Sequence, residues 1–280
     1  MPRKLAAWTD IAAVTQAHLT QIRESGLPCL LMVTHALGGG VERHIHELIQ
    51  VLQGRAHVLV LKPYHYAGYV SLQLSAGEPV PDALYYAMPA DVDELARRLQ
   101  SLGVVRVHVH HVIGYDASLL ALIQRLGLPV DLTLHDYTVI NGNPTLTNDR
   151  GIYDSRQLES VADEALAPDA RLLRQIAACA ARVIAPSHAV RQRVNRALPT
   201  LNIQVQAHPD RERHGPYPPP RPARLTPAEP LRVLCMGTLG PEKGAGVLGA
   251  VARYSGRAGL PLQFVLLGSA HLPLPKSVHV

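Results

Sequence analysis

Residues 231–244 read LRVLCMGTLGPEKG, an apolar run followed by a turn with three glycines and one lysine. The run Leu231–Met236 predicts a buried strand, and residues 245–254 predict a helix directly after the turn. A glycine-rich turn between strand and helix brings backbone N–H groups and the positive end of the helix together. We therefore expect a phosphate site at residues 237–244, where Lys243 adds a mobile cation. A plain turn without a ligand is the alternative, and the order of residues excludes a P-loop.

The same alternation of short apolar runs and longer amphipathic runs extends through the chain upstream of this unit. Strands are expected at residues 29–34, 56–62, 83–88, 105–110, 130–135, 182–185 and 203–207. Helices are expected at residues 4–24, 41–53, 91–102, 118–126, 172–181 and 187–198. This alternation predicts right-handed βαβ crossovers and an α/β fold with a parallel sheet. Ligands of such sheets bind beyond the carboxyl ends of the strands, so the residues there are the candidates for a site.

A proline-rich segment separates two predicted domains. Seven prolines lie between Pro216 and Pro230, which is typical of a semi-rigid linker. We predict a Rossmann-like domain at residues 1–208, a linker at residues 209–230 and the beginning of a second Rossmann-like domain at residues 231–280. Further strands are expected at residues 262–267 and 278–280, and the second domain is expected to be incomplete in this chain.

Composition excludes several classes of protein. The 280 residues are 47% apolar and 18% charged, as in globular proteins, and the net charge is +5. The basic residues form no long run, so nucleic acid is not expected as the partner. The densest basic cluster is Arg191, Arg193 and Arg196, which predicts either a solvated helix face or a contact with anionic lipid head groups. Without a signal peptide or an apolar run of about 20 residues, the chain is expected in the cytoplasm, or peripheral to the inner face of the membrane.

Three glycines, Gly38, Gly39 and Gly40, follow the first predicted strand and allow the backbone to approach a ligand closely. A dinucleotide fingerprint requires a further glycine at the position of Arg43 and an acidic residue after the second strand, where Lys62 stands. Both requirements fail, so NAD binding is disfavoured. A tight turn without a ligand is again the alternative.

Histidines follow two further predicted strands. His108 and His110 alternate onto one face of a strand that ends at His111, and the next strand ends at His135 and Asp136. Two histidines without a third ligand nearby in sequence make a weak metal site, so no metal is expected. A histidine at the position of His135 faces the cleft and can donate or accept a hydrogen bond. The alternative is that His135 only caps the end of the strand and contacts no ligand.

Taken in order, these motifs resemble the GT-B nucleotide-sugar glycosyltransferases, specifically the retaining group 1 or family 4 enzymes. The resemblance covers nearly the whole chain and is carried by the stretches 38–42, 110–111, 133–137, 183–188, 208–210 and 237–244. It implies a GT-B fold of two facing Rossmann-like domains, with the acceptor held mainly by the first and a nucleotide-diphosphate sugar held by the second. No metal or other cofactor is expected, because cationic side chains neutralise the diphosphate.

The resemblance also implies roles for individual residues. His135 would approach the donor sugar, and Lys243 would stabilise the departing diphosphate. The donor and its phosphates would be contacted by Gly38, Gly39, Gly40, Gly237, Thr238, Lys243 and Gly244. The cleft on the acceptor side would be lined by His110, His111, Asp136 and Tyr137. Thr238 departs from the family pattern, which usually has an arginine there, and the paired glutamates of the donor domain have no counterpart.

Two functions follow as alternatives. The first is a glycosyltransferase that moves a sugar from a nucleotide-diphosphate sugar to a glycan or lipid-linked acceptor, as in polysaccharide biosynthesis, and that is incomplete in this chain. The second is a non-catalytic or degenerate GT-B module that binds a sugar or a protein partner. The missing pair of glutamates separates the two, because it holds the donor in the active family members. Without it, the chain alone is expected to have little transferase activity.

Overall fold

The computed structural model describes residues 17, 19–64, 68–73, 83–209 and 230–279. The chain forms two compact units, which we describe separately. The first comprises residues 1–144 and 158–212, and the second comprises residues 145–157 and 213–280. The predicted boundary near residue 208 is close to the end of the first unit, whereas the association of residues 145–157 with the second unit was not expected. The predicted linker lies almost wholly outside the described residues, and the three-part domain division stays a prediction.

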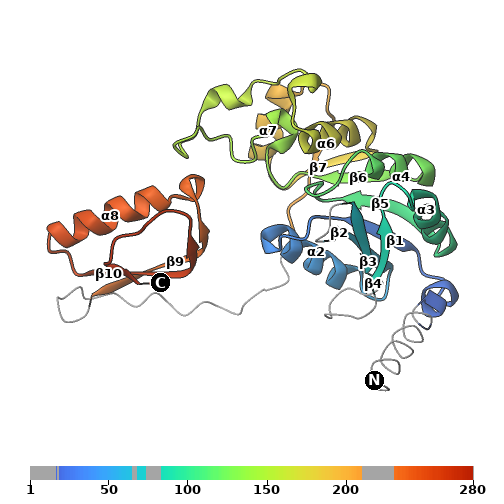
Figure 1. Ribbon diagram of the computed structural model, residues 1–280, viewed down its shortest axis with the longest axis horizontal. Coiled ribbons are helices and arrows are strands. Elements are labelled where there is room, and N and C mark those ends of the chain that lie inside the picture. The colour runs from blue at the N-terminus through green and yellow to red at the C-terminus, as the bar shows by residue number, and fades with distance from the viewer. Residues whose placement is uncertain (1–16, 18, 65–67, 74–82, 210–229, 280) are drawn as a thin grey trace. The chain divides into compact units, whose positions relative to one another are not determined.

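The first unit is built on an eight-stranded sheet with the order β4-β3-β2-β1-β5-β6-β7-β8 (Figure 1). Its strands are β1 (Cys29–Val33), β2 (His57–Pro63), β3 (Tyr69–Gln73), β4 (Ala83–Ala87), β5 (Val104–Val109), β6 (Val130–Thr133), β7 (Arg182–Ala185) and β8 (Ile203–Val205). Strand β1 is central and pairs in parallel with both β2 and β5. The parallel order continues through β6, β7 and β8, so the carboxyl ends of these strands share one edge of the sheet.

Among the described residues, five longer helices and two short ones of the first unit connect these strands. They are α2 (Gly39–Leu52), α3 (Val92–Ser101), α4 (Ser118–Leu126), α5 (Thr138–Asn141), η2 (Asp163–Ala165), α6 (Pro168–Cys179) and α7 (His188–Ala197). A further short helix, η1 (Ser155–Leu158), lies mostly in the segment 145–157 that belongs to the second unit. Leu31, Met32 and Val33 of β1 are all buried, which shows that both faces of the central sheet are covered. Helix α2 covers the face that carries Met32 and packs Ile45 against it. No described helix is long and apolar enough to cross a bilayer.

The predicted α/β class is confirmed, but one edge of the sheet differs from the prediction. Strand β3 was not predicted, and it pairs antiparallel with both β2 and β4. The sheet is therefore mixed, with a parallel centre and an antiparallel edge. The five residues of β3 are too few for a clear periodicity, and an antiparallel strand can follow its neighbour without a crossover helix to mark it. Helix α6 also begins four residues before its predicted start, with Pro168 at its first turn.

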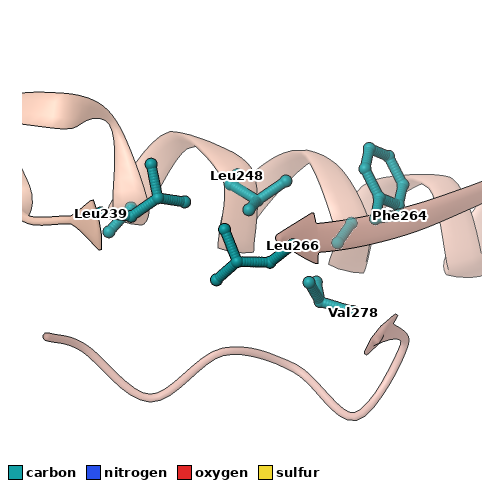
Figure 2. Close-up of a cluster of buried hydrophobic side chains, with 7 residues drawn as sticks. Leu239, Leu248, Phe264, Leu266 and Val278 are labelled. Carbon is teal, nitrogen blue, oxygen red and sulfur yellow. The ribbon is translucent and has the colours of Figure 1, made fainter. Parts of the chain in front are cut away.

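The second unit contains one βαβ arrangement. Its elements are β9 (Leu231–Leu239), η3 (Pro241–Lys243), α8 (Ala245–Arg257), β10 (Leu262–Ala270) and β11 (Val278–His279). The three strands are parallel in the order β11-β10-β9. Figure 2 shows the core between α8 and this sheet, where Leu248 meets Leu266 and Phe264.

Strand β9 is three residues longer than predicted. Gly237 and Thr238 lie inside it and pair with Gly268 and Ser269 of β10. The expectation that they belong to the turn is therefore wrong, and the turn itself is only residues 240–244. The strand was predicted to end at Met236 because the apolar run stops there. In the structure, backbone pairing with β10 continues to Leu239.

Candidate functional site

The carboxyl ends of β1, β5 and β6 bring together most of the predicted site residues of the first unit. Gly38 and Gly39 follow β1 with φ values of 71° and 79°, in the left-handed region that favours glycine. They allow the chain to turn sharply from the strand into α2, and Gly40 continues into that helix. Glu42 at the first turn of α2 forms a 2.8 Å ion pair with Lys62. Lys62 therefore fixes the beginning of α2 to the end of β2. Gly38, Gly39 and Gly40 have no side chains of their own that could cover the backbone at this point.

His111 and Asp136 form an ordered pair at the ends of β5 and β6. His111 Nδ1 accepts hydrogen bonds from the amides of Val112 (3.0 Å) and Ile113 (3.2 Å). Nε2 must then carry the hydrogen, and it lies 3.1 Å from Oδ2 of Asp136. Burial alone would raise the pKa of Asp136, but the hydrogen bonds from His111 and from the Thr138 amide outweigh it and lower that pKa. Asp136 is thus held as a carboxylate that can accept hydrogen bonds from a hydroxyl-rich ligand.

Tyr137 follows this pair and contacts α7. Its hydroxyl accepts a 3.1 Å hydrogen bond from Arg193, and the Arg193 guanidinium also lies 5.9 Å from the centre of its ring. One of the three arginines of the basic cluster is therefore used inside the first unit. Ser187 accepts a hydrogen bond from the Val190 amide, as expected for the residue that caps α7.

A cluster of histidines occupies the same edge of the sheet. His110 is 1% exposed, and its Nδ1 lies 3.1 Å from Nε2 of His135, so the two rings share one hydrogen bond. His44 of α2 packs against both rings, with centroid distances of 5.4 and 5.2 Å. His208, which follows β8, packs against His44 at 3.8 Å. His108, two residues before His110, lies 4.1 Å from it.

Burial keeps these imidazoles neutral. It lowers the pKa of His44 and of His108 to about 4, and the pKa of His135 to about 3. The pKa of His110 is lowered well below its ordinary value for the same reason, and its histidine neighbours add to the effect. Neutral imidazoles offer a lone pair and one N–H group, so this cluster can accept, donate or ligate, but it does not supply positive charge to an anion.

A cavity of about 420 Å³ lies beside the histidine cluster. Its lining includes His44, His108 and His208, together with apolar residues of α2. The sheet contributes an ion cluster around the buried Asp131, which contacts Arg106 at 2.8 Å and also binds Arg182. Burial alone would raise the pKa of Asp131, but Arg182 and Arg106 outweigh it and lower that pKa. This cluster ties three neighbouring strands together on the floor of the cavity.

Lys243 and its turn belong to the second unit. Gly244 has φ 82°, and the amides of Lys243, Gly244 and Ala245 already donate within the turn. An anion at this turn could therefore bind only through later amides of the first turn of α8 and through the Lys243 side chain. The phosphate role of Lys243 stays a prediction.

Two residues of this site were not singled out in the sequence. His44 stands on an amphipathic helix, where a single histidine resembles any polar residue, and Asp131 lies inside a short apolar run that did not indicate its contacts with two arginines. His208 belongs to the stretch 208–210 that carries the family resemblance, but its contact with His44 was not predicted. All three are far along the chain from their partners, so no local spacing pointed to these contacts.

A comparison with protein-family models matches residues 38–206 to the family described as Glycosyltransferase Family 4. A search of curated proteins found no match. Among solved structures, HepE of Anabaena in complex with UDP and glucose is similar, with 15% identity, a TM-score of 0.45 and coverage of 86% of this chain. MnaA of S. aureus in complex with UDP is also similar, with 10% identity, a TM-score of 0.47 and coverage of 90%. The chain spans 61% of the first of these proteins and 64% of the second.

The family match includes the glycine-rich loop after β1, the histidines that follow β5 and β6, and the Ser187 cap after β7. It covers most of the first unit and more than half of the chain. The family predicted from the ordered motifs is thereby confirmed, together with its GT-B-like α/β fold. This chain belongs to glycosyltransferase family 4.

Proposed function

We propose that this chain carries the acceptor-side domain and part of the donor-side domain of a retaining glycosyltransferase. The reaction would move a sugar from a nucleotide-diphosphate sugar to a glycan or lipid-linked acceptor. The observation that carries the proposal is the family match over residues 38–206, which includes the ends of β5 and β6, where His110, His111, His135 and Asp136 gather. Such an edge of a parallel sheet is where α/β proteins bind their ligands.

The first unit would contribute hydrogen bonds rather than positive charge. Asp136 is an ordered carboxylate and His135 a neutral imidazole, and both follow β6. We propose that Asp136, His111 and Tyr137 orient the hydroxyl groups of the acceptor, while His135 donates a hydrogen bond to the reacting sugar. The loop of Gly38, Gly39 and Gly40 would let the sugar or its diphosphate approach the backbone.

The second unit would contribute the positive charge. As the sugar leaves the nucleotide, negative charge develops on the diphosphate, and a fixed cation next to it lowers the barrier. Lys243 ends η3, two residues before α8 begins at Ala245, so it lies next to the helix end whose dipole favours an anion. We propose that Lys243 pairs with the diphosphate, with no metal ion needed for that step. Gly237 and Thr238 lie inside β9, so they would line this site from the end of that strand and not from the turn.

The charge of Lys243 can be removed without affecting a buried core. We expect Lys243→Ala in the full-length protein to lower the rate of sugar transfer by about a hundredfold or more, the scale seen when one charge-stabilising group is lost. The rate is measured with a panel of nucleotide sugars, and the anomeric configuration of the product is followed by NMR. Retention of configuration is the expected result.

Lys276→Ala is the matched control, because Lys276 is an exposed lysine of the same unit. It should leave the rate unchanged. Equal rates for the unaltered protein and Lys243→Ala would show that the turn only packs. If no nucleotide sugar is turned over but one is still bound, the non-catalytic alternative is supported instead.

A membrane contact would suit a lipid-linked acceptor. Arg193 is occupied by Tyr137, whereas Arg196 of α7 is exposed. We propose that α7 can rest against anionic head groups through such side chains, and sedimentation with anionic and with neutral vesicles tests this contact.

A further inference from the structure

The histidine cluster has the composition of a metal site. One ring nitrogen from each of His44, His110 and His135 lies within 4.8 Å of one nitrogen of each of the other two. Three elements supply them, because His44 stands on α2 and the other two follow β5 and β6. The rings are buried or half-buried, and no carboxylate belongs to the group. Imidazole ligands of this kind suit zinc and its neighbours in the first transition row.

Two nitrogens of the cluster point to a ligand that the protein itself does not provide. Among the described residues, Nδ1 of His44 and Nε2 of His110 are buried and form no hydrogen bond. A buried polar atom without a partner destabilises the fold, usually by about 1–3 kcal/mol. Both atoms belong to the rings that could ligate an ion. Coordination through Nδ1 of His44 would remove this cost at that ring. At His110 the ligand would be Nδ1, the atom that lies next to His135, so coordination leaves the cost at Nε2 of that ring.

The spacing of one pair already matches tetrahedral coordination. With zinc–nitrogen bonds of about 2.05 Å, two ligands of a tetrahedral ion lie about 3.3 Å apart. Nδ1 of His110 and Nε2 of His135 are 3.1 Å apart, so one ion can replace the hydrogen that they share. The nitrogen of His44 lies within 4.8 Å of the other two, so it would have to move closer by up to about 1.5 Å for tetrahedral coordination.

A fourth ligand and an entry path are also present. The ring of His208 lies 3.8 Å from the ring of His44 and 5.4 Å from that of His135. Its side chain is exposed, and both His44 and His208 line the 420 Å³ cavity. His108 packs against the ring of His110, and its Nε2 lies 2.8 Å from the hydroxyl of Thr133. It would therefore help to orient His110 without binding the ion itself.

We propose that His44, His110, His135 and His208 bind one divalent transition-metal ion of the zinc class. Four protein ligands close the coordination sphere, so the ion would be structural and would fix α2 and the segment after β8 to the ends of β5 and β6. This proposal does not depend on the proposed transferase function. It would also place Nε2 of His135 on the ion, which leaves only Nδ1 of that ring for a sugar.

The test uses the untagged chain after removal of metals with a chelator. Cobalt(II) is added first, because a tetrahedral cobalt site gives a visible absorption band of high intensity. Zinc(II) is then titrated in competition with a chromophoric chelator. We expect one equivalent of each metal to bind, zinc to bleach the cobalt band, and zinc to raise the thermal midpoint of unfolding.

Variants of single histidines identify the ligands. We expect His44→Ala and His135→Ala to weaken zinc binding by more than about tenfold, the smallest loss usual even for residues that only support a ligand. His46→Ala is the control, because His46 lies on the same helix but is exposed. It should bind zinc as the unaltered chain does.

Two results would overturn the proposal. One is the absence of saturable cobalt and zinc binding at one equivalent in the unaltered chain, which requires no variant to fold. The other is an equal loss in His46→Ala and His44→Ala. If the buried variants do not fold, His208→Ala removes an exposed ligand, and an unchanged cobalt spectrum in that variant would exclude His208 from the site.

Discussion

At the residue scale, one hydroxyl connects the loop after β5 to the two central strands. Tyr115 Oη donates to the backbone oxygen of Leu61 at 2.7 Å and lies 3.1 Å from that of Thr34. We expect Tyr115→Phe to lower the free energy of unfolding by about 1 kcal/mol, the usual net value of one such bond. Urea unfolding measures the change. Tyr85→Phe, with an exposed ring on β4, should change stability by less than about 0.5 kcal/mol, and equal midpoints for both variants would contradict this role of Tyr115.

Single residues also show what the sequence could and could not predict. Ser187 was correctly predicted as a helix cap, because capping depends on neighbours within one turn. His110, His111, His135 and Asp136 were correctly placed at strand ends, because parallel strands present those ends together. The partners of these residues were not predicted. His44 reaches the cluster only through the packing of α2 on the sheet, and Asp131 reaches Arg182 only through the pairing of β6 with β7.

At the element scale, β10 shows how one strand separates two environments. Leu266 is 1% exposed and packs in the core beside α8 (Figure 2). Its neighbour Leu267 is 58% exposed, on the opposite face of the strand. Removing a buried leucine side chain usually costs about 2–5 kcal/mol. We expect Leu266→Ala to destabilise the second unit by about 3 kcal/mol, and Leu267→Ala to have little effect. Hydrogen exchange of the β9 and β10 amides measures both, and similar losses of protection would show that this core is loosely packed.

Strand order was predictable at this scale only where crossover helices separate the strands. The amphipathic patterns of α2, α4 and α6 allowed the parallel strands on either side to be recognised, because apolar residues recur with different periods in helices and in strands. The antiparallel edge of β3 and β4 has no such helix between its strands. The turn after β9 was misplaced for a related reason, because backbone pairing extends β9 beyond its last apolar residue.

At the scale of the whole molecule, acid should unfold the two units unequally. In the metal-free chain, burial lowers the pKa of His44 and of His108 from 6.5 to about 4, although Glu47 and Asp131 oppose the shift. The unfolded chain takes up protons at these sites near pH 6.5, but the folded unit does not do so until about pH 4. Stability of the first unit should therefore fall as the pH drops through this window.

The second unit has no matching buried histidine among its described residues, since His271 and His279 are exposed. Hydrogen exchange at several pH values, corrected for the intrinsic rate and with a chelator present, distinguishes the units. We expect the amides of α2, β5 and β6 to lose protection between about pH 6.5 and 4, while those of β9 and β10 keep theirs. Equal losses in both units would show that the histidines do not govern acid sensitivity.

The order of the eight strands also bears on how a growing chain can assemble. Strand β1 is made first and lies at the centre; β2, β3 and β4 then extend the sheet on one side, and β5 to β8 extend it on the other. Each new strand meets an edge that already exists, so the sheet can grow outward during synthesis without waiting for a later segment. His208 follows the last strand to be added. The four histidines can therefore meet only when the nascent first unit is finished.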